Sequence, residues 1–554
     1  MEIIVLLIAA IVFYIVGYKT HGRHISINLE VNSKEPTPAH LKKDGVDFVP
    51  AKLPILFGHH FASIAGAGPI VGPIIASGFG WFPVYLWLLI GAVFIGGVHD
   101  YTSIIASVRH EGKSIGEIIE RYIGINGRRL FLAFAWSTLI LVIAVFINIV
   151  ADTFVRTPSA ATSSLLFMLV AIVFGITSFK FRISTIKASF IAVPLLFFSV
   201  YIGNLFPLNI NKETWQLIMF GYIFIASVTP VWLLLQPRDY LNSFLLYALM
   251  IGAFVGIFFA SPNLHLPAFT SFSVKNLGYL FPVLFVTVAC GAISGFHSLV
   301  SSGTTSKQLN KMVDAKRVGY GGMLLEGILA VLALFAVASL KPSEFDKFYE
   351  LQLFVPAFAE GIGRFIESIP IVNISLDSAR TFTSLAVSAF ALTTLDTSTR
   401  LARFLFQEST DNPQENNTVT KNKKGSLFQN RFFATFITVL LGALLTFSGQ
   451  SASLWPIFGS ANQLLAAFAL LSITTWLAHQ KFPYFFTLIP TIFMFTVTSM
   501  ALITLIYLNL FTERNYMLVA IAFSLLAISI IMCSKAYIQL RKVIIKNNKV
   551  QEEF

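Results

Sequence analysis

Two adjacent histidines stand beside a run of glycine and proline residues in an otherwise apolar stretch. His59 and His60 precede Gly66, Gly68 and Pro69. Proline removes a backbone donor and glycine tolerates unwound backbone, so this run predicts a broken helix. Unwound backbone at membrane depth persists only where it is buried in protein or lines a wet cavity, where it binds ions and small molecules. Close helix packing through the glycines is the alternative. The predicted ligand-binding residues here are His59, His60, Ser63, Gly66 and Gly68.

A second stretch of the same character runs from Cys290 to Thr305 and contains three glycines and six Ser or Thr hydroxyls. Hydroxyls beside an unwound carbonyl suit Na⁺, and a protonatable side chain suits H⁺. Each hydroxyl has a simpler alternative, because Ser and Thr also bond back to their own helix. The predicted ion-binding residues here are His297, Ser298, Ser301, Ser302 and Thr305.

Other polar residues interrupt apolar segments. Intramembrane carboxylates are costly, which makes Asp100 and Asp396 functional candidates. For Asp396, a helix cap or an ion pair with Arg400, one turn away, is the alternative. The amides of Asn462 and Gln463 either contact a ligand or bond between helices. We predict that Asp100, Thr394 and Asp396 serve ion coupling, and that His99, Thr229, Asn462 and Gln463 contact substrate.

The histidines also raise a metal-site alternative. His59, His60, His99 and His297, with Asp100, are residue types that bind metals. Adjacent histidines point to different faces of a helix, unlike the two histidines one turn apart in a zinc protease. An intramembrane metalloenzyme would therefore need unwound backbone at His59 and His60. We predict no metal and no cofactor other than a coupling ion.

Composition indicates that these residues lie in a membrane protein. The chain has 554 residues, of which 56% are hydrophobic and only 12% are charged, and its mean hydropathy is +0.75. A soluble domain carries about 25% charged residues, so lipid must be the solvent here. The net charge of +12 comes from basic residues scattered through short loops and the C-terminal end. That pattern fits an anionic membrane surface better than nucleic acid.

Apolar segments of about 17–25 residues are long enough to cross a bilayer as helices, and about fifteen occur along the chain. They are approximately Glu2–Gly17, Pro54–Ser77, Trp81–Ser107, Leu130–Ala151, Ser164–Phe179, Ala188–Phe206, Trp215–Leu235, Phe244–Ala260, Tyr279–Ser302, Gly321–Leu340, Thr381–Thr399, Phe432–Phe447, Leu454–Ala478, Phe485–Leu510 and Met517–Met532.

Every second loop between these segments is basic. Because cytoplasmic loops collect Lys and Arg, this alternation predicts an outside N-terminus, a cytoplasmic C-terminus and an odd number of spans. The polar stretch 409–425 is predicted to be a cytoplasmic linker. The segment 341–380 is either an interfacial helix over the outer face or a folded loop.

The polar motifs together resemble the carbon starvation protein A family of bacterial inner-membrane proteins. The likeness rests on the stretches at 58–73, 97–101, 236–240, 291–305, 393–397 and 458–465. It implies uptake of small peptides or proton-coupled uptake of pyruvate. It also implies the fold of the amino acid–polyamine–organocation superfamily, an inverted repeat of five helices like that of LeuT.

On that resemblance, the broken second span begins one repeat and the Thr229-Pro230 span begins the other. The resemblance also implies that Ser301, Ser302 and Thr305 face carbonyls near Ala65 and Gly66. An inverted repeat of seven plus seven helices, pairing the second and ninth spans, is the alternative. The predicted divisions are an extra helix and basic loop (1–53), two repeats (54–214 and 215–400), a linker (401–431) and C-terminal helices with a basic tail (432–554).

We therefore predict an all-α polytopic inner-membrane transporter that works by alternating access. A small metabolite, pyruvate or a small peptide or amino acid, would bind at mid-membrane with H⁺ or Na⁺ as the coupling ion. No phosphate-binding loop is evident, so ion gradients would drive transport. An uncoupled channel is the other alternative. The oligomeric state is left open.

Overall fold

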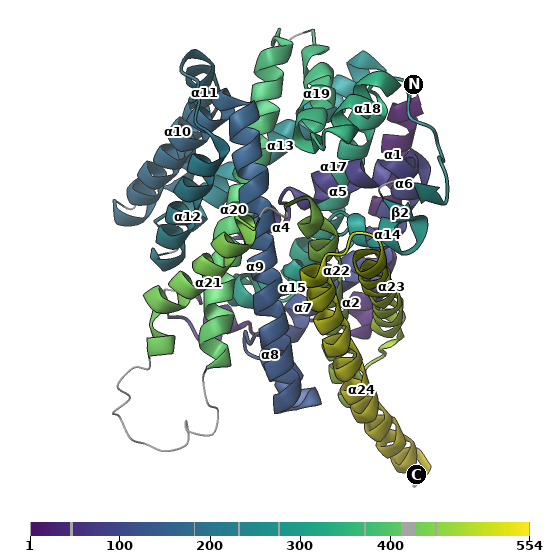
Figure 1. Cartoon of the computed structure of the whole chain (residues 1–554). Helices are drawn as coiled ribbons and strands as arrows, with labels where there is room; N and C mark the ends of the chain where they lie inside the picture. Colours follow the sequence, from purple (N-terminus) through teal and green to yellow (C-terminus); the bar gives the residue numbers. More distant parts are fainter. Residues whose placement is uncertain are drawn as a thin grey trace.

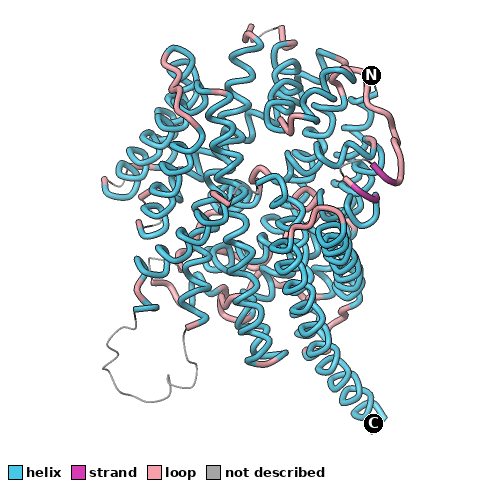
Figure 2. The backbone as a smooth tube through the Cα atoms, viewed as in Figure 1, coloured by secondary structure: helices cyan, strands magenta, loops and turns pink. Residues whose placement is uncertain are grey.

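The computed structural model describes the chain except for residues 1, 45–47, 182, 231–232, 275–276, 371–372, 411–426, 449–450 and 553–554. Helices form nearly all of it, and the strands in the described part are the short antiparallel pair β1 (Ser273–Val274) and β2 (Gly278–Tyr279) (Figure 2). The predicted all-α class is therefore confirmed. Most of the predicted linker at 401–431 falls on 411–426, outside the described residues.

Ten helical segments of the described chain are long and apolar enough to cross a membrane. They contain α1 (Glu2–Lys19) with α2 (His21–Asn28), α6 (Trp81–Gly91) with α7 (Gly97–Arg109), α9 (Ile125–Arg156), α10 (Pro158–Gly175), α11 (Thr185–Leu205), α13 (Leu235–Ala260), α17 (Gly321–Ala338), α22 (Ser451–His479), α23 (Phe485–Phe511) and α24 (Tyr516–Glu552).

The other five predicted segments are helical too, but they are broken, short or polar. The bent pair α4 (Leu53–Ile64) and α5 (Gly68–Ala76) would make an eleventh span. The remainder are α12 (Lys212–Val228), the interrupted pair α14 (Leu280–Thr287) and α15 (Gly295–Val300), α20 (Leu376–Ser409) and α21 (Arg431–Thr446). Each predicted segment thus overlaps a helix or a helix pair.

Two of these segments are unwound in the middle. α4 ends at Ile64 and α5 begins at Gly68, with a bend of 43° between them. α14 ends at Thr287 and α15 begins only at Gly295. Gly72 allows the two broken helices to approach, because a methyl group added there would lie 2.5 Å from the Thr287 carbonyl oxygen. The predicted breaks in the second and ninth segments are therefore both present.

The seventh predicted segment, Trp215–Leu235, is helical only as far as Val228. α12 ends at Val228, and Thr229 and Pro230 lie in the connection to α13. Proline ends a helix here rather than interrupting one, because the chain turns into the next helix within a few residues. The predicted unwound backbone at Thr229-Pro230 is therefore present, and it lies between α12 and α13 rather than inside one helix.

The same order of elements follows each broken helix. The first is followed by α6–α7, the amphipathic α8 (Ile115–Ile123) and the long α9; the second is followed by α17, the amphipathic α19 (Phe354–Glu367) and the long α20. α9 and α20 pack along each other through the centre of the molecule (Figure 1). Each of the two broken helices is thus followed by the same succession of a membrane-length helix or helix pair, an amphipathic helix and a long helix.

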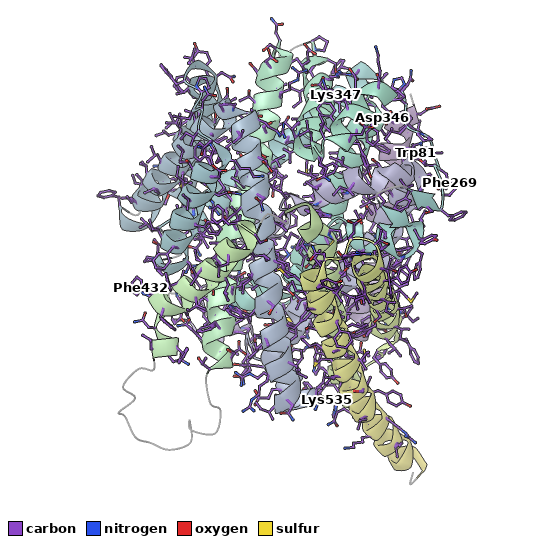
Figure 3. All side chains as sticks on the ribbon, viewed as in Figure 1. Trp81, Phe269, Asp346, Lys347, Phe432 and Lys535 are labelled. Atoms are coloured by element: carbon purple, nitrogen blue, oxygen red, sulfur yellow. The ribbon has the colours of Figure 1, made fainter. Side chains whose placement is uncertain are left out.

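The segment 341–380 forms helices rather than a loop. α18 (Pro342–Glu350) and α19 cover the upper end of the molecule in Figure 1, and α19 is largely buried against α13, α17 and α20. Arg364 donates to both Glu344 and Glu360, which ties α18 to α19. Figure 3 labels Asp346 and Lys347 at this end and Lys535, on α24, toward the other.

The remaining short helices lie at the predicted cytoplasmic loops. They are α3 (Pro38–Leu41), α16 (Ser306–Gln308) and α8, and Ser114 caps α8 by accepting from the Glu117 N–H. The basic loops predicted to be inside therefore fold partly as helical turns.

Candidate transport site

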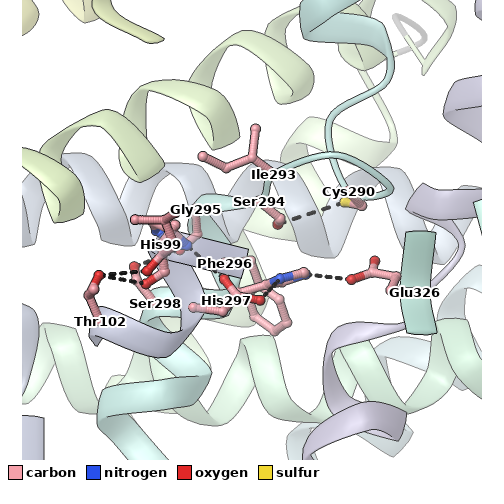
Figure 4. A network of polar contacts seen from close by, with 12 residues as sticks. His99, Thr102, Cys290, Ile293, Ser294, Gly295, Phe296, His297, Ser298 and Glu326 are labelled. Carbon is pink, nitrogen blue, oxygen red and sulfur yellow. Dashed lines mark hydrogen bonds and ion pairs between the residues drawn. The ribbon is translucent and has the colours of Figure 1, made fainter. Parts of the chain in front are cut away.

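A fully buried group of acids and histidines lies where α7, α15 and α17 meet. We call His99, Asp100, His297 and Glu326 the acid–histidine cluster, and each of these side chains is 0% exposed. Asp100 Oδ2 lies 2.8 Å from His297 Nδ1, and Asp100 Oδ1 lies 2.7 Å from His99 Nδ1. His297 Nε2 lies 3.3 Å from Glu326 Oε2. Figure 4 shows the His297 ring pointing toward Glu326. One imidazole therefore bridges two carboxylates inside the membrane.

Backbone unwinding and an amide cap position His297. Asn462 Oδ1 accepts from the Phe296 N–H at 2.9 Å, and the Asn462 amide donates to Ser294 Oγ at 3.0 Å. These bonds fix the start of α15, which would otherwise leave buried N–H groups unpaired. Gln463 donates to the Phe285 carbonyl at 3.0 Å, on the other side of the break. In this structure both amides bond between helices and hold the second break in shape.

Close contacts join the two breaks. His60 Nδ1 lies 2.8 Å from Thr305 Oγ1, which links α4 to the π-helical turn Ser301–Thr305 after α15. The His297 ring also interacts with the Ile64 carbonyl at the end of α4. A change in the charge of His297 therefore alters interactions that both broken helices make.

A second buried polar group contains an arginine. We call Tyr222, Arg238, Asp239 and Asp396 the arginine cluster, and it joins α12, α13 and α20. Arg238 is only 1% exposed; its guanidinium donates to Asp396 Oδ2 and to the Tyr222 hydroxyl. Tyr222 also donates to Asp396 Oδ2, at 2.6 Å. His59 Nδ1 lies 3.2 Å from Asp239 Oδ2, which attaches the cluster to α4.

The first break touches the long central helices and the second break. A methyl group added at Gly66 would lie 2.5 Å from Thr394 Oγ1 and 2.9 Å from the Phe146 ring, and one added at Gly68 would collide with the Cys290 side chain. The predicted residues Gly66, Gly68 and Thr394 are thus brought together. His59 Nε2 and His60 Nε2 are buried with no hydrogen-bond partner among the described residues.

The hydroxyls of the second break differ in the groups that they contact. Ser302 Oγ donates to the Ser298 carbonyl, and Ser298 Oγ to the Gly295 carbonyl, so both bond back to their own helix. Ser301 Oγ is buried without a hydrogen-bond partner in the described part of the chain. Thr305 faces His60 instead.

In the first break, the hydroxyl of Ser63 also bonds back to its own helix, by donating to the His59 carbonyl.

Thr229 lies apart from this arrangement. Its hydroxyl donates to the Ile225 carbonyl of its own helix, and its carbonyl accepts from Arg400 at 2.5 Å. Arg400 also donates to the Ala226 carbonyl, so it closes the end of α12.

Two cavities approach the breaks from opposite ends of the molecule. The cavity at the end that the sequence predicts to face outside, called here the outer cavity, has a volume of about 510 Å³ and is lined by α5, α9 and α22, including Val71, Val145 and Pro456. Phe146 follows Val145 directly, and its ring lies 6.0 Å from that of Phe458, measured between centroids. Both rings are buried, and the Phe146 ring also lies against Gly66 of the first break.

The inner cavity, of about 410 Å³, reaches Leu299 and Ser302 after the second break. Its rim carries charged residues, among them Lys42, Glu111 and Glu408. Burial raises the pKa of Glu408, although the nearby Arg128 guanidinium opposes that shift. The outer cavity thus reaches α5 after the first break, and the inner cavity reaches α15 after the second.

Sequence reasoning missed Glu326 and misassigned Arg238. Glu326 is the one charged residue in Gly321–Ala338. Asp100 was identified as a candidate because a carboxylate in an apolar segment is costly, and the same reasoning identifies Glu326. Arg238 follows Pro237 and looks like a basic loop residue, but the chain has already entered α13 and buries it. Tyr222 gave no signal, because a tyrosine in an apolar helix is ordinary.

Comparison with known proteins decides the family. The family described as "Carbon starvation protein CstA" matches residues 2–354 and 350–501. The chain belongs to the carbon starvation protein CstA family. A relative from Bacillus subtilis (strain 168), named peptide transporter CstA, is 33% identical over 558 residues, covering 92% of each chain. A relative from Escherichia coli (strain K12), named pyruvate/proton symporter BtsT, is 30% identical and is covered over 81% of its length, with 90% of this chain.

This CstA-family chain is accordingly a membrane transporter and not an enzyme. A solved manganese transporter from Eremococcus coleocola has a similar fold, with a TM-score of 0.51, 12% sequence identity, and coverage of 90% of this chain and 99% of that one. Within the described residues, no group of three or more His, Cys, Asp or Glu side chains is arranged to hold a metal ion.

Proposed function

We propose that the protein is a secondary transporter that imports a small carboxylate-bearing metabolite together with H⁺, by alternating access. Pyruvate and small peptides, the substrates in the names of its relatives, both carry a carboxylate. The observation that carries the proposal is a fully buried, titratable cluster that touches two broken helices, one of which lines the outer cavity and the other the inner cavity. A coupled carrier needs these parts: two access routes and an ion site between them.

The hydroxyl geometry favours H⁺ over Na⁺ as the coupling ion. A sodium cage needs several oxygens that converge on one point. Here the hydroxyls of Ser298 and Ser302 are directed to carbonyls of their own helix. A proton needs only one basic group, and His297 lies between two carboxylates. We therefore propose that Asp100 and His297 belong to the proton site.

Substrate is proposed to bind at the first break. The Nε2 atoms of His59 and His60 are buried donors or acceptors without a partner in the described chain. The N-terminal end of α5, at Gly68, adds the positive end of a helix dipole, which favours a carboxylate. Phe146 and Phe458 would have to move for solute to pass from the outer cavity to Gly66. The family's presence in bacteria and the basic loops support an inner-membrane location with the N-terminus outside.

Gradient-driven uptake tests the proposal. Purified protein in liposomes would be given labelled pyruvate, and separately a labelled dipeptide, under an imposed proton gradient and then a sodium gradient. We expect accumulation of one substrate above its external concentration under the proton gradient, abolished by a protonophore. Protein-free liposomes control for diffusion of the neutral acid. Accumulation only under the sodium gradient would contradict proton coupling, and equilibration without accumulation would indicate a channel.

A further inference from the structure

Glu326 is the carboxylate of this site that the protein stabilises least. It lies in the middle of α17, is 0% exposed, and within the described residues neither of its oxygens accepts a hydrogen bond. In the described part of the chain, the basic group that pairs with it is His297, whose Nε2 lies 3.3 Å from Oε2. Asp100 on α7 and Cys290 before α15 also interact with it, and His60 on α4 interacts with Asp100 and His297.

Asp100, in contrast to Glu326, has partners for both of its carboxylate oxygens. Both of its oxygens are in contact with an imidazole nitrogen, at 2.7 and 2.8 Å. An ionised carboxylate buried away from water costs several kcal/mol unless partners compensate it. Asp100 has such partners and Glu326 does not, so a proton added to the cluster is held best at Glu326.

Charge balance gives the same answer. With His297 protonated and both carboxylates ionised, His297, Asp100 and Glu326 carry one net negative charge. One further proton on Glu326 makes them neutral, which is the state that a dry membrane interior favours. No arginine or lysine contacts these residues among the described interactions, so nothing fixed holds their charge.

We propose that Glu326 is the residue that carries the coupling proton, with His297 as the group that passes it on. This inference rests on the proposed transport function and adds a residue to its ion site. In the transfer step the N–H bond at His297 Nε2 breaks and an O–H bond forms on a Glu326 oxygen. The electron pair of the N–H bond stays on the nitrogen, and the incoming coupling proton then binds to this pair. His297 is again protonated and still bonded to Asp100 through Nδ1, Glu326 is neutral, and the three residues together carry no net charge.

The position of His297 explains how this proton reaches the moving parts. His297 lies in α15 directly after the second break, and its ring interacts with the Ile64 carbonyl at the first break. Protonating Glu326 removes a negative charge next to this ring. The attraction between α17 and α15 then weakens, while the attraction between α7 and α15 remains. A proton bound on α17 thereby changes the balance of contacts at both broken helices.

The test is Glu326→Gln, which keeps the shape of the side chain and cannot release a proton. Two assays are run on the same liposomes: accumulation of labelled pyruvate or dipeptide driven by a proton gradient, and exchange of labelled for unlabelled substrate without a gradient. We expect accumulation to fall from up to about tenfold for a gradient of one pH unit to no accumulation. Exchange should stay within about twofold of the wild type, because substrate contacts are intact.

Two variants make the result interpretable. Glu513→Gln removes an exposed carboxylate in the turn between α23 and α24 and should transport like the wild type. Glu326→Asp keeps a protonatable group and should retain gradient-driven accumulation with a shifted pH profile. If Glu326→Gln loses exchange as well, Glu326→Asp decides: retained accumulation supports the proposal, and loss of all transport in a folded Glu326→Asp protein overturns it.

The two proposals fail in different ways. Wild-type protein that never responds to a proton gradient contradicts the proposed function itself. Wild-type protein that accumulates substrate while Glu326→Gln accumulates it equally well overturns only the assignment of the proton to Glu326.

Discussion

The acid–histidine cluster and the arginine cluster are both buried and both touch the first broken helix, yet they are built for different tasks. The arginine cluster contains a guanidinium, which stays charged at all accessible pH values. Asp396 Oδ2 takes donors from both Arg238 and Tyr222, so fixed partners compensate negative charge on that oxygen. The acid–histidine cluster has imidazoles in place of the guanidinium, and its Glu326 oxygens have no hydrogen bond among the described residues.

The difference shows that a carboxylate inside a membrane protein does not by itself identify an ion site. The partner of the carboxylate determines its role. A carboxylate paired with a permanent cation forms a structural link, whereas one paired with a titratable group can gain and lose protons. On this reasoning we assign Asp396 to holding α13 against α20. Its role in ion coupling stays a prediction, and measurements of stability and transport on variants of each cluster separate the two assignments.

Removing the permanent cation should have the largest effect. Arg238→Met leaves Asp396 and Asp239 buried without their cation, and breaking a buried pair in this way costs about 3–5 kcal/mol. We expect a large loss of folded protein in detergent, measured by thermal unfolding with size-exclusion analysis. Arg541→Met, on the exposed part of α24, is the matched control. A stability within about 1 kcal/mol of the wild type would contradict the structural assignment.

The cap on the second break comes next. Asn462→Ala removes the bonds to the Phe296 N–H and to Ser294, and should cost about 1–2 kcal/mol. Because α15 carries His297, gradient-driven uptake should fall as well. Asn462→Asp keeps the acceptor for the Phe296 N–H, and at a pH low enough to keep its buried carboxyl protonated it should lose less stability. Equal losses in both variants would mean that this bond does not set the start of α15.

Glu326→Gln should hardly change stability. The side chain loses no hydrogen bond, so the free energy of unfolding should change by less than about 1 kcal/mol. The contrast with Arg238→Met is the clearest expression of the difference between the clusters. A loss as large as that of Arg238→Met, in the same unfolding assay, would show that Glu326 is a structural anion.

The smallest effect is expected at the outer end, away from both clusters. Arg364 bonds to Glu344 and lowers the pKa of that carboxyl from 4.5. A lowered folded-state pKa stabilises the fold above the unfolded value, and this contribution is lost as pH falls through the folded value. Glu344→Gln should therefore cost at most about 1 kcal/mol at pH 7, a difference that shrinks below about pH 4.5. Thermal unfolding measured across pH would detect it, and a difference that grew on acidification would contradict the assignment.

Much of the fold could be predicted from the sequence because its signals are local. The helical segments follow from apolar runs, and the break at Gly66–Gly68 follows from glycine and proline. Asp100 and His297 stood out because they are polar in apolar surroundings. Glu326 carried the same signal in its own segment and could have been found in the same way.

The pairing of the clusters could not be predicted, because it depends on tertiary contacts. Arg238 and Asp396 are 158 residues apart, and nothing near Arg238 indicates that it is buried rather than in a loop. Whether Ser298 and Ser302 face an ion or their own helix depends on a rotation that the sequence does not specify. The interruption at Thr229-Pro230 was predicted, but whether it bends one helix or separates two could not be, because a proline either ends a helix or bends it, and tertiary packing decides between the two.

Proton entry with substrate tests the central claim most directly. Liposomes containing the protein and a pH-sensitive dye would receive external pyruvate, or a dipeptide, with no initial pH gradient. The account predicts acidification of the lumen that requires substrate and protein, exceeds that of protein-free liposomes, and disappears in Glu326→Gln. Substrate entry without acidification beyond that background would contradict proton coupling, and acidification that persists in Glu326→Gln would contradict the role of Glu326.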